Sequence, residues 1–203
     1  MSFYDAIRVG ASGAADFEVE RSLRFTRGST NYLERTPSSN GNKRTFTFSF
    51  WIKRGELTSS LHTFFSAGSN NPDFIVKFTP SEQFEISRYG GSSYTNQVTS
   101  TQLFRDSSAW FHLVGAVDTT QATASNRVKM YVNGVQLISF ANSSYPSQDY
   151  EYPEINDTGF SMKIGKHGSN SQNFDGYMTE INFIDGLQLT PSSFAETNSE
   201  TGQ

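Results

Sequence analysis

The sequence contains no cysteine, which excludes disulfide scaffolds, thiolate zinc sites and cysteine nucleophiles. It also lacks an apolar run of the roughly 18 residues that a membrane-spanning helix needs, because the long stretch from Trp110 to Val117 is interrupted by His112. Charged residues make up only 18% of the chain, the net charge is −4, and Lys and Arg are scattered. We therefore expect neither membrane insertion nor nucleic-acid binding.

In place of charge the chain is rich in small polar and aromatic residues. Ser, Thr and Asn together make up about 31% of the 203 residues, which also include 18 Phe and 9 Tyr. This composition is typical of strands and turns, and it excludes a helical bundle. A chain of this length can bury roughly 70% of its unfolded surface, so it can fold as one domain without a metal.

The clearest predicted strand covers residues 44–53, where apolar and polar residues alternate strictly. Period-two alternation is typical of a strand with one buried face. The side chains predicted to face the core are Phe46, Phe48, Phe50 and Ile52, and those predicted to face outward are Thr45, Thr47, Ser49 and Trp51.

Similar patterns recur along the chain and predict about ten strands. Residues 128–132 and 135–137 flank Asn133-Gly134, the strongest short-range hairpin signal. Residues 110–117 are apolar on both faces, which indicates a central strand covered on both sides. Further strands are predicted near 23–25, 74–78, 84–86, 160–164 and 177–183, with one helical turn after Thr190-Pro191. No helix is long enough for a parallel crossover, so we expect an antiparallel two-sheet jelly-roll β-sandwich.

The ordered motifs SFWIK (49–53), WFHLVGAVD (110–118), KMYVNG (129–134), FDGYMTEI (174–181) and LTP (189–191) carry a resemblance. The series resembles the concanavalin A-like, laminin G-like and pentraxin-like jelly rolls. The resemblance covers roughly residues 21–196 and implies that these residues form the domain. It leaves an N-terminal arm and linker at 1–20 and a polar tail at 197–203.

The N-terminal arm differs in character from the rest of the chain. Residues 10–15 form a linker of small residues. The arm is interpreted either as a disordered terminus or as a docking segment that orders on a partner. Its candidate anchoring side chains are Phe3, Tyr4, Ile7 and Val9.

The stretch FYDAIRVGASGA, which runs into ERSLRF, resembles the start of laminin G-like structural proteins of marine bacteriophages. That resemblance implies a module on the virion surface, attached by the arm to other capsid or tail proteins. We expect it to be a homo-oligomer on the particle.

Carboxylates occur together at 149–154, the one place where a glycosidase pair is conceivable. A retaining glycosidase needs two carboxylates about 5 Å apart that face the sugar together. Pro153 cannot belong to a central strand, and Ser143, Ser144, Pro146 and Ser147 indicate a loop here. The sequence therefore predicts a protein that is not an enzyme.

Calcium needs six to eight oxygen ligands, and relatives in the superfamily bind it at the rim of the sandwich. Asp118 and Asp175 are the candidate calcium ligands, with turn-stabilising side chains as the alternative interpretation. No cofactor is certain from the sequence.

Glycan binding requires aromatic faces beside planar hydrogen-bonding groups. The loop richest in both contains the candidate site Tyr145, Asp149, Tyr150 and Tyr152. Tyr89 and Tyr94 around Gly90-Gly91 are a second candidate. Alternatively, these loop tyrosines cover the ends of the sandwich.

Taken together, the residues predict a non-enzymatic virion protein, either a capsid decoration or a short spike, that binds host-surface glycans. A free lectin is one alternative, although the N-terminus shows no export signal. A polysaccharide-cleaving enzyme is the other.

Overall fold

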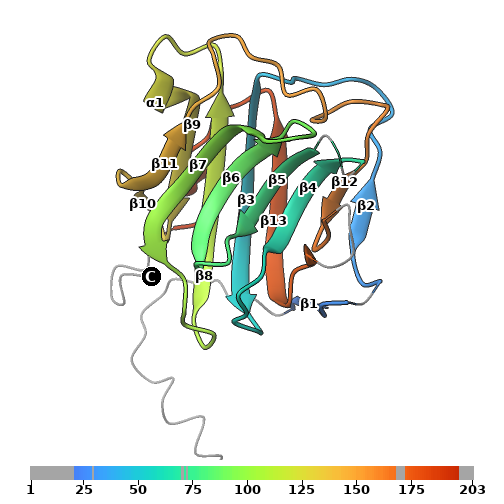
Figure 1. Ribbon diagram of the computed structural model, residues 1–203, viewed down its shortest axis with the longest axis vertical. Helices are drawn as coiled ribbons and strands as arrows, with labels where there is room; N and C mark the ends of the chain where they lie inside the picture. Colours follow the sequence, from blue (N-terminus) through green and yellow to red (C-terminus); the bar gives the residue numbers. More distant parts are fainter. Residues whose placement is uncertain (1–20, 29, 70, 72, 168–171, 197–203) are drawn as a thin grey trace, which may run out of the picture.

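The computed structural model describes residues 21–28, 30–69, 71, 73–167 and 172–196. These residues form two antiparallel sheets that pack face to face as a sandwich (Figure 1), which confirms the predicted architecture. The N-terminal arm at 1–20, with its candidate anchoring residues, and the tail at 197–203 lie outside the described residues.

The first sheet has six strands in the order β1-β13-β3-β8-β9-β10. Strand β3 lies in its middle, paired along its full length with β8 and, across one irregularity, with β13. The bounds of these strands are β1 Leu23–Phe25, β3 Thr45–Arg54, β8 Trp110–Asp118, β9 Val128–Val132, β10 Val135–Gln136 and β13 Gly176–Asp185.

The second sheet has seven strands in the order β11-β7-β6-β5-β4-β12-β2 and lies in front of the first in Figure 1. Its strands are β2 Leu33–Arg35, β4 His62–Gly68, β5 Asp73–Phe78, β6 Gln83–Tyr89, β7 Tyr94–Leu103, β11 Phe140–Ser144 and β12 Met162–Ile164. Between β8 and β9 lies the helix α1, Ala124–Arg127. No helix in the described part of the chain has the length and apolar character needed to cross a membrane.

Four strands were not predicted from the sequence: β2, β4, β7 and β11. Strand β4 is buried on both faces and so shows no alternation, whereas β7 is mostly polar and is recognisable only by its pairing with β6. Ser143 and Ser144 were expected to lie in a loop and instead belong to β11, because their backbone pairs with β7. The helical turn after Thr190 is confirmed as the 3-10 turn η2, Pro191–Ser193.

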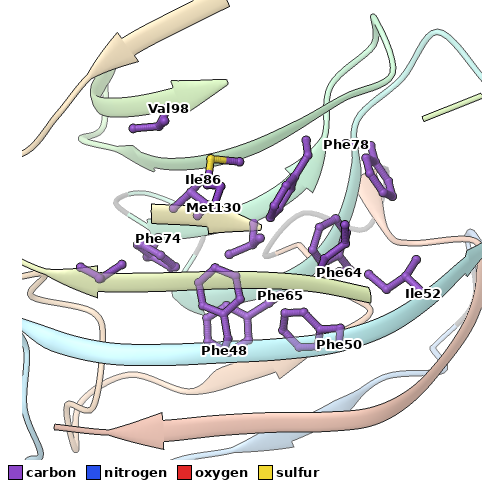
Figure 2. Close-up of a cluster of buried hydrophobic side chains, with 14 of the residues drawn as sticks. Phe48, Phe50, Ile52, Phe64, Phe65, Phe74, Phe78, Ile86, Val98 and Met130 are labelled. Atoms are coloured by element: carbon purple, nitrogen blue, oxygen red, sulfur yellow. The ribbon is translucent and has the colours of Figure 1, made fainter. Parts of the chain in front are cut away.

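The core between the sheets consists largely of phenylalanine rings (Figure 2). The predicted inward row of β3 belongs to the core cluster, which confirms the assignment of its faces. On the outward face, Thr47 and Ser49 are buried as well. The Phe48 ring stacks on Phe65 of the opposite sheet, with ring centres 5.9 Å apart, and Phe50 meets Phe64 edge-on at 5.7 Å. Each such ring contributes about 1.5–3 kcal/mol through burial, which holds the two sheets together.

The C-terminal segment covers part of the outer face of the six-stranded sheet. The hydroxyl of Thr47 on β3 donates to the carbonyl of Leu187 at 2.7 Å and accepts from the amide of Leu189 at 2.9 Å. Farther along, Phe194 packs against a small outer cluster that contains Val114 and Tyr131. Strand β8 is therefore covered on both faces, as its sequence predicted.

The hairpin between β9 and β10 has the predicted turn. Asn133 and Gly134 have φ values of 48° and 81°, the left-handed conformation that this two-residue turn requires. Tyr131, two residues earlier, points outward as expected but is only 7% exposed, because Phe194 covers it.

Candidate functional site

A pocket of about 780 Å³ lies on the outer face of the six-stranded sheet, beside the C-terminal segment. We call it the aromatic pocket because four of its lining side chains are aromatic rings. Its aromatic lining residues are Trp51, Trp110, His112 and Tyr131, and its polar ones include Asn133 and Glu196.

The aromatic pocket follows from strand pairing. Trp51 occupies an outward position of β3, and the register places it directly opposite His112 on β8. The backbone of His112 is in turn hydrogen-bonded to Asn133 at the end of β9, through Asn133 N to His112 O at 2.8 Å and His112 N to Asn133 Oδ1 at 2.9 Å. Adjacent strands thus assemble one continuous floor from residues far apart in the chain.

The two rings at the floor are fixed in place. The indole of Trp51 and the imidazole of His112 stack with ring centres 4.9 Å apart and an interplanar angle of 17°. The Nε2 atom of His112 lies 2.8 Å from the hydroxyl of Ser49. Burial lowers the pKa of His112, so the imidazole is neutral at neutral pH. His112 is 2% exposed, whereas Trp51 and Trp110 are half-buried and accessible to a ligand.

The C-terminal segment forms the opposite wall of the aromatic pocket. The 3-10 turn η2 brings Pro191 and Ser192 to its edge, with the hydroxyl of Thr190 2.9 Å from that of Ser192. The exposed carboxylate of Glu196 lies at the end of this wall. Half-buried indole rings beside amide, hydroxyl and carboxylate groups match what a sugar ring requires.

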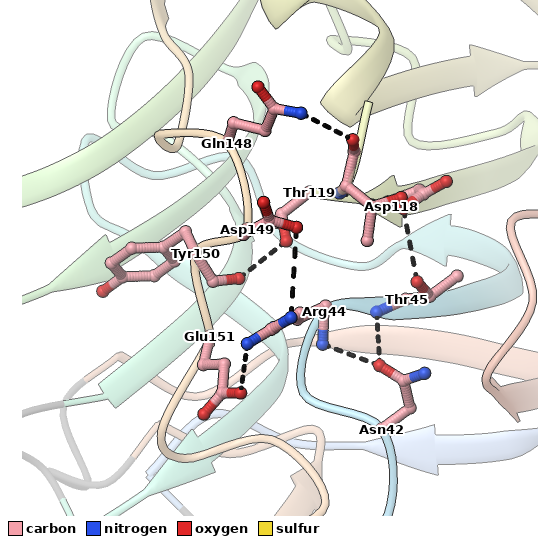
Figure 3. Close-up of polar contacts among 10 residues, drawn as sticks. Asn42, Arg44, Thr45, Asp118, Thr119, Gln148, Asp149, Tyr150 and Glu151 are labelled. Carbon is pink, nitrogen blue, oxygen red and sulfur yellow. Dashed lines mark hydrogen bonds and ion pairs between the residues drawn. The ribbon is translucent and has the colours of Figure 1, made fainter. Parts of the chain in front are cut away.

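The loop that the sequence favoured as a glycan site, residues 145–152, lies beside the start of β3 and the end of β8 (Figure 3). Tyr152 was expected to contact a ligand, and this expectation is wrong. Its ring is 1% exposed and meets Phe46 and Phe74 edge-on at 5.8 and 5.1 Å, and burial raises its pKa. Tyr152 belongs to the core because it fills the end of the space between the sheets.

The remaining residues of this loop do not converge on one cavity. The guanidinium of Arg44 lies 2.9 Å from the Glu151 carboxylate and 3.9 Å from that of Asp149, at the exposed surface. Half-buried Tyr150 packs edge-on against Tyr152 at 5.1 Å. Tyr145 lines a separate cavity of about 430 Å³ beside β9 and β11. The structure therefore does not bring the predicted glycan-binding set together.

The second predicted tyrosine pair lies on the outer face of the seven-stranded sheet. Tyr89 and Tyr94 meet edge-on at 5.4 Å, and the hydroxyl of Tyr94 accepts a hydrogen bond from Lys77 Nζ at 2.7 Å. Lys77 also forms a buried ion pair with Glu85 at 3.0 Å. Tyr94 covers this ion pair, so part of its ring contacts the protein and is not available to a ligand.

The two calcium candidates do not share a site. Asp118 pairs with the start of β3 and accepts hydrogen bonds from Thr45, Thr120 and Gln121, which lower its pKa against the effect of burial. Asp175 lies beyond the other end of β3 and is paired with Arg24 at 3.0 Å. Among the described residues, no group of three or more acidic, histidine or cysteine side chains could hold a metal. Asp118 and Asp175 thus have the turn and ion-pair roles of the alternative interpretation.

The carboxylates at 149–154 do not face a common cleft. Glu154 is fully buried and binds Arg88 through two hydrogen bonds of 2.7 and 3.1 Å, whereas Glu151 is exposed and paired with Arg44. Of the two carboxylates whose spacing suggested a catalytic pair, one therefore lies in the core and the other at the surface.

Reasoning from the sequence missed the aromatic pocket. It placed Trp51 on the outward face of its strand but assigned that tryptophan no role. The available signal was a tryptophan among small polar residues, since the other outward side chains of β3 are threonine, serine and lysine. The partner rings His112 and Tyr131 could be recognised only once the register was known.

Comparisons with known proteins agree with the fold. A family model described as the concanavalin A-like lectin/glucanases superfamily matches residues 27–192. No curated protein sequence matches this chain.

Three solved structures are similar over most of their length. A heptameric SAP-like pentraxin from Limulus polyphemus is 15% identical, with a TM-score of 0.57 and coverage of 89% of this chain and 82% of the pentraxin. Domain 4 of the extracellular arabinanase AbnA from Geobacillus stearothermophilus, in complex with arabinotriose, is 20% identical, with a TM-score of 0.59 and coverage of 93% and 80%. The CBM40 of the Ruminococcus gnavus IT-sialidase, bound to α2,3 sialyllactose, is 13% identical, with a TM-score of 0.53 and coverage of 80% and 96%.

Proposed function

Because the chain belongs to the concanavalin A-like lectin/glucanase superfamily, we propose that it is a non-enzymatic carbohydrate-binding module whose ligand occupies the aromatic pocket. The observation that carries this proposal is the pair of accessible tryptophans, Trp51 and Trp110, at a cavity large enough for a sugar unit. Two of the similar structures hold oligosaccharides, which supports the same class of ligand.

The arrangement suits a sugar because the ring C–H groups of a pyranose pack on an aromatic face while its hydroxyls need polar partners. Trp51 is held by its stack on His112, so little side-chain freedom is lost when a ligand binds. Asn133 and Ser192 supply amide and hydroxyl groups at the rim of the pocket.

The test is to measure binding of Trp51→Ala and Trp110→Ala to whichever glycan an array of the wild-type module identifies. Each variant should weaken binding by about tenfold or more, the scale of one lost aromatic contact with its burial. Tyr150→Ala, in the loop 145–152, is the matched control and should bind like wild type. If both tryptophan variants bound the glycan normally and Tyr150→Ala lost binding, the glycan site would lie in the loop 145–152 and not in the aromatic pocket.

We also propose that the module is displayed on a bacteriophage particle. The support is the likeness of the opening stretch, from Phe3 to Phe25, to virion proteins of marine phages. Anchoring would use the apolar side chains Phe3, Tyr4, Ile7 and Val9, with other virion proteins as partners and the module as a homo-oligomer.

The attachment proposal predicts that deleting residues 1–15 leaves thermal melting unchanged but abolishes co-sedimentation with particles that lack the protein. Much lower melting would mean that the arm belongs to the fold, and retained binding to particles would place attachment on the sandwich.

The non-enzymatic character is supported by the separation of the acidic residues Glu151 and Glu154. Release of reducing ends from a polysaccharide by the wild-type module, lost in Glu151→Gln or Glu154→Gln, would contradict it. Because Glu154 is buried in an ion pair, the folding of that variant must be checked by melting.

A further inference from the structure

The aromatic pocket has an asymmetric charge. Of its described lining residues, Glu196 alone carries a full charge at neutral pH, and neither lysine nor arginine is among them. Burial lowers the pKa of His112 and raises that of Tyr131, so both rings are neutral there. A ligand in the pocket therefore meets aromatic faces and one carboxylate.

The nearest lysine along β3 is Lys53, which shares the outward face with Trp51 but does not line the pocket. Its charge acts on Asp106, whose pKa is lowered mainly by hydrogen bonds from Ser108 and more weakly by Lys53. Lys53 is also the ladder partner of Trp110, so its cation lies beside the edge of the pocket and not among its lining residues.

This distribution discriminates between classes of sugar. A carboxylate or sulfate on the ligand would lose water and find no cation among the described lining residues, which is costly. A protonated amine would be attracted both by the faces of the tryptophan rings and by the Glu196 carboxylate.

We infer that the aromatic pocket prefers glycans that carry a free amino group over their uncharged and acidic counterparts. The inference rests on the proposed carbohydrate-binding function and names its ligand class. The amine lies near Glu196, and the apolar faces of the sugar lie against Trp51 and Trp110.

The experiment compares three oligosaccharides of equal length by calorimetry: glucosamine, N-acetylglucosamine and galacturonate oligomers. The measurements are made at low salt and about pH 6, where the amines of the glucosamine oligomer are mostly protonated. The glucosamine oligomer should bind about two- to fivefold more tightly than the N-acetylated one, the scale of one exposed ion pair. Added salt should reduce this difference.

Glu196→Gln removes the carboxylate and should reduce the preference for the amine while leaving binding of the N-acetylated oligomer unchanged. Glu151→Gln is the matched control, because it changes the net charge equally but lies in the loop 145–152, away from the pocket. It should leave the preference intact, which separates the pocket from general attraction to an acidic protein.

Two kinds of result would overturn the inference while leaving the proposed function standing. One is binding of galacturonate as tight as that of glucosamine and sensitive to Trp51→Ala. The other is an unchanged preference in Glu196→Gln. By contrast, no binding in any arm, or binding that neither Trp51→Ala nor Trp110→Ala reduces, would contradict the proposed function itself.

Discussion

The contact between Phe48 and Gly115 gives a sharp test of how the two sheets pack. These residues are direct partners on β3 and β8, and Phe48 is fully buried. An ideal Cβ on Gly115 would overlap Cζ and Cε2 of the Phe48 ring and lie 2.9 Å from Cδ1 of Ile86, whereas ordinary contact begins near 3.4 Å. Glycine is therefore required here because the phenylalanine ring lies across its backbone.

Both single substitutions should destabilise the protein, for opposite reasons. Phe48→Ala removes a ring that contacts Phe50, Phe65 and Phe74, and should cost about 3–5 kcal/mol. For a chain of this size that lowers Tm by roughly 6–20 °C. Gly115→Ala forces the Phe48 ring to move by about 1 Å in a close-packed core and should cost about 1–3 kcal/mol.

The double variant separates this explanation from a general loss of stability. With alanine at both positions the new methyl group enters space that the ring has left, so its cost largely disappears. Urea denaturation should then give a coupling free energy of about 1–3 kcal/mol in the double-mutant cycle. Additive effects of the two substitutions would show that the ring does not lie over Gly115, and an unchanged midpoint in Phe48→Ala would show that the faces of β3 are reversed.

Three further predictions use the same denaturation assay. Burial, with nearby arginines, lowers the pKa of His62 to about 4. The unfolded imidazole, with a pKa near 6.5, takes up a proton that the folded one does not, so acidification from pH 7 to 4 should lower the free energy of unfolding by up to about 3 kcal/mol. His62→Gln should remove that part of the pH dependence. An equal loss of stability in wild type and variant would refute the explanation. Glu154→Ala leaves Arg88 unpaired and should cost about 3–5 kcal/mol, whereas a surface-like effect below about 0.5 kcal/mol would contradict its burial. Tyr131→Ala should cost about 1.5–3 kcal/mol, since Phe194 covers the ring, and not the much smaller amount expected of an outward-facing strand residue.

The local alternation of apolar and polar residues was enough to predict much of the sandwich. Strict alternation correctly predicted the faces of β3 and the strands β5, β6 and β9, and Asn133-Gly134 predicted the hairpin. It failed for β4 and β7, because a strand buried on both faces does not alternate and a polar strand lacks an apolar signal. Those two strands form because adjacent strands satisfy their backbone hydrogen bonds, which is a property of the assembled sheet.

The sequence by itself determined the fold class, the inward phenylalanine row and the outward position of Trp51, because side-chain alternation is local to a strand. Only the tertiary structure decided which aromatic residues meet. The ladder between β3 and β8 brings His112 beside Trp51, the C-terminal segment buries Tyr131, and the space between the sheets takes Tyr152 into the core. Each outcome depends on a partner that is distant in the chain, and burial is a property of the surroundings that such a partner creates.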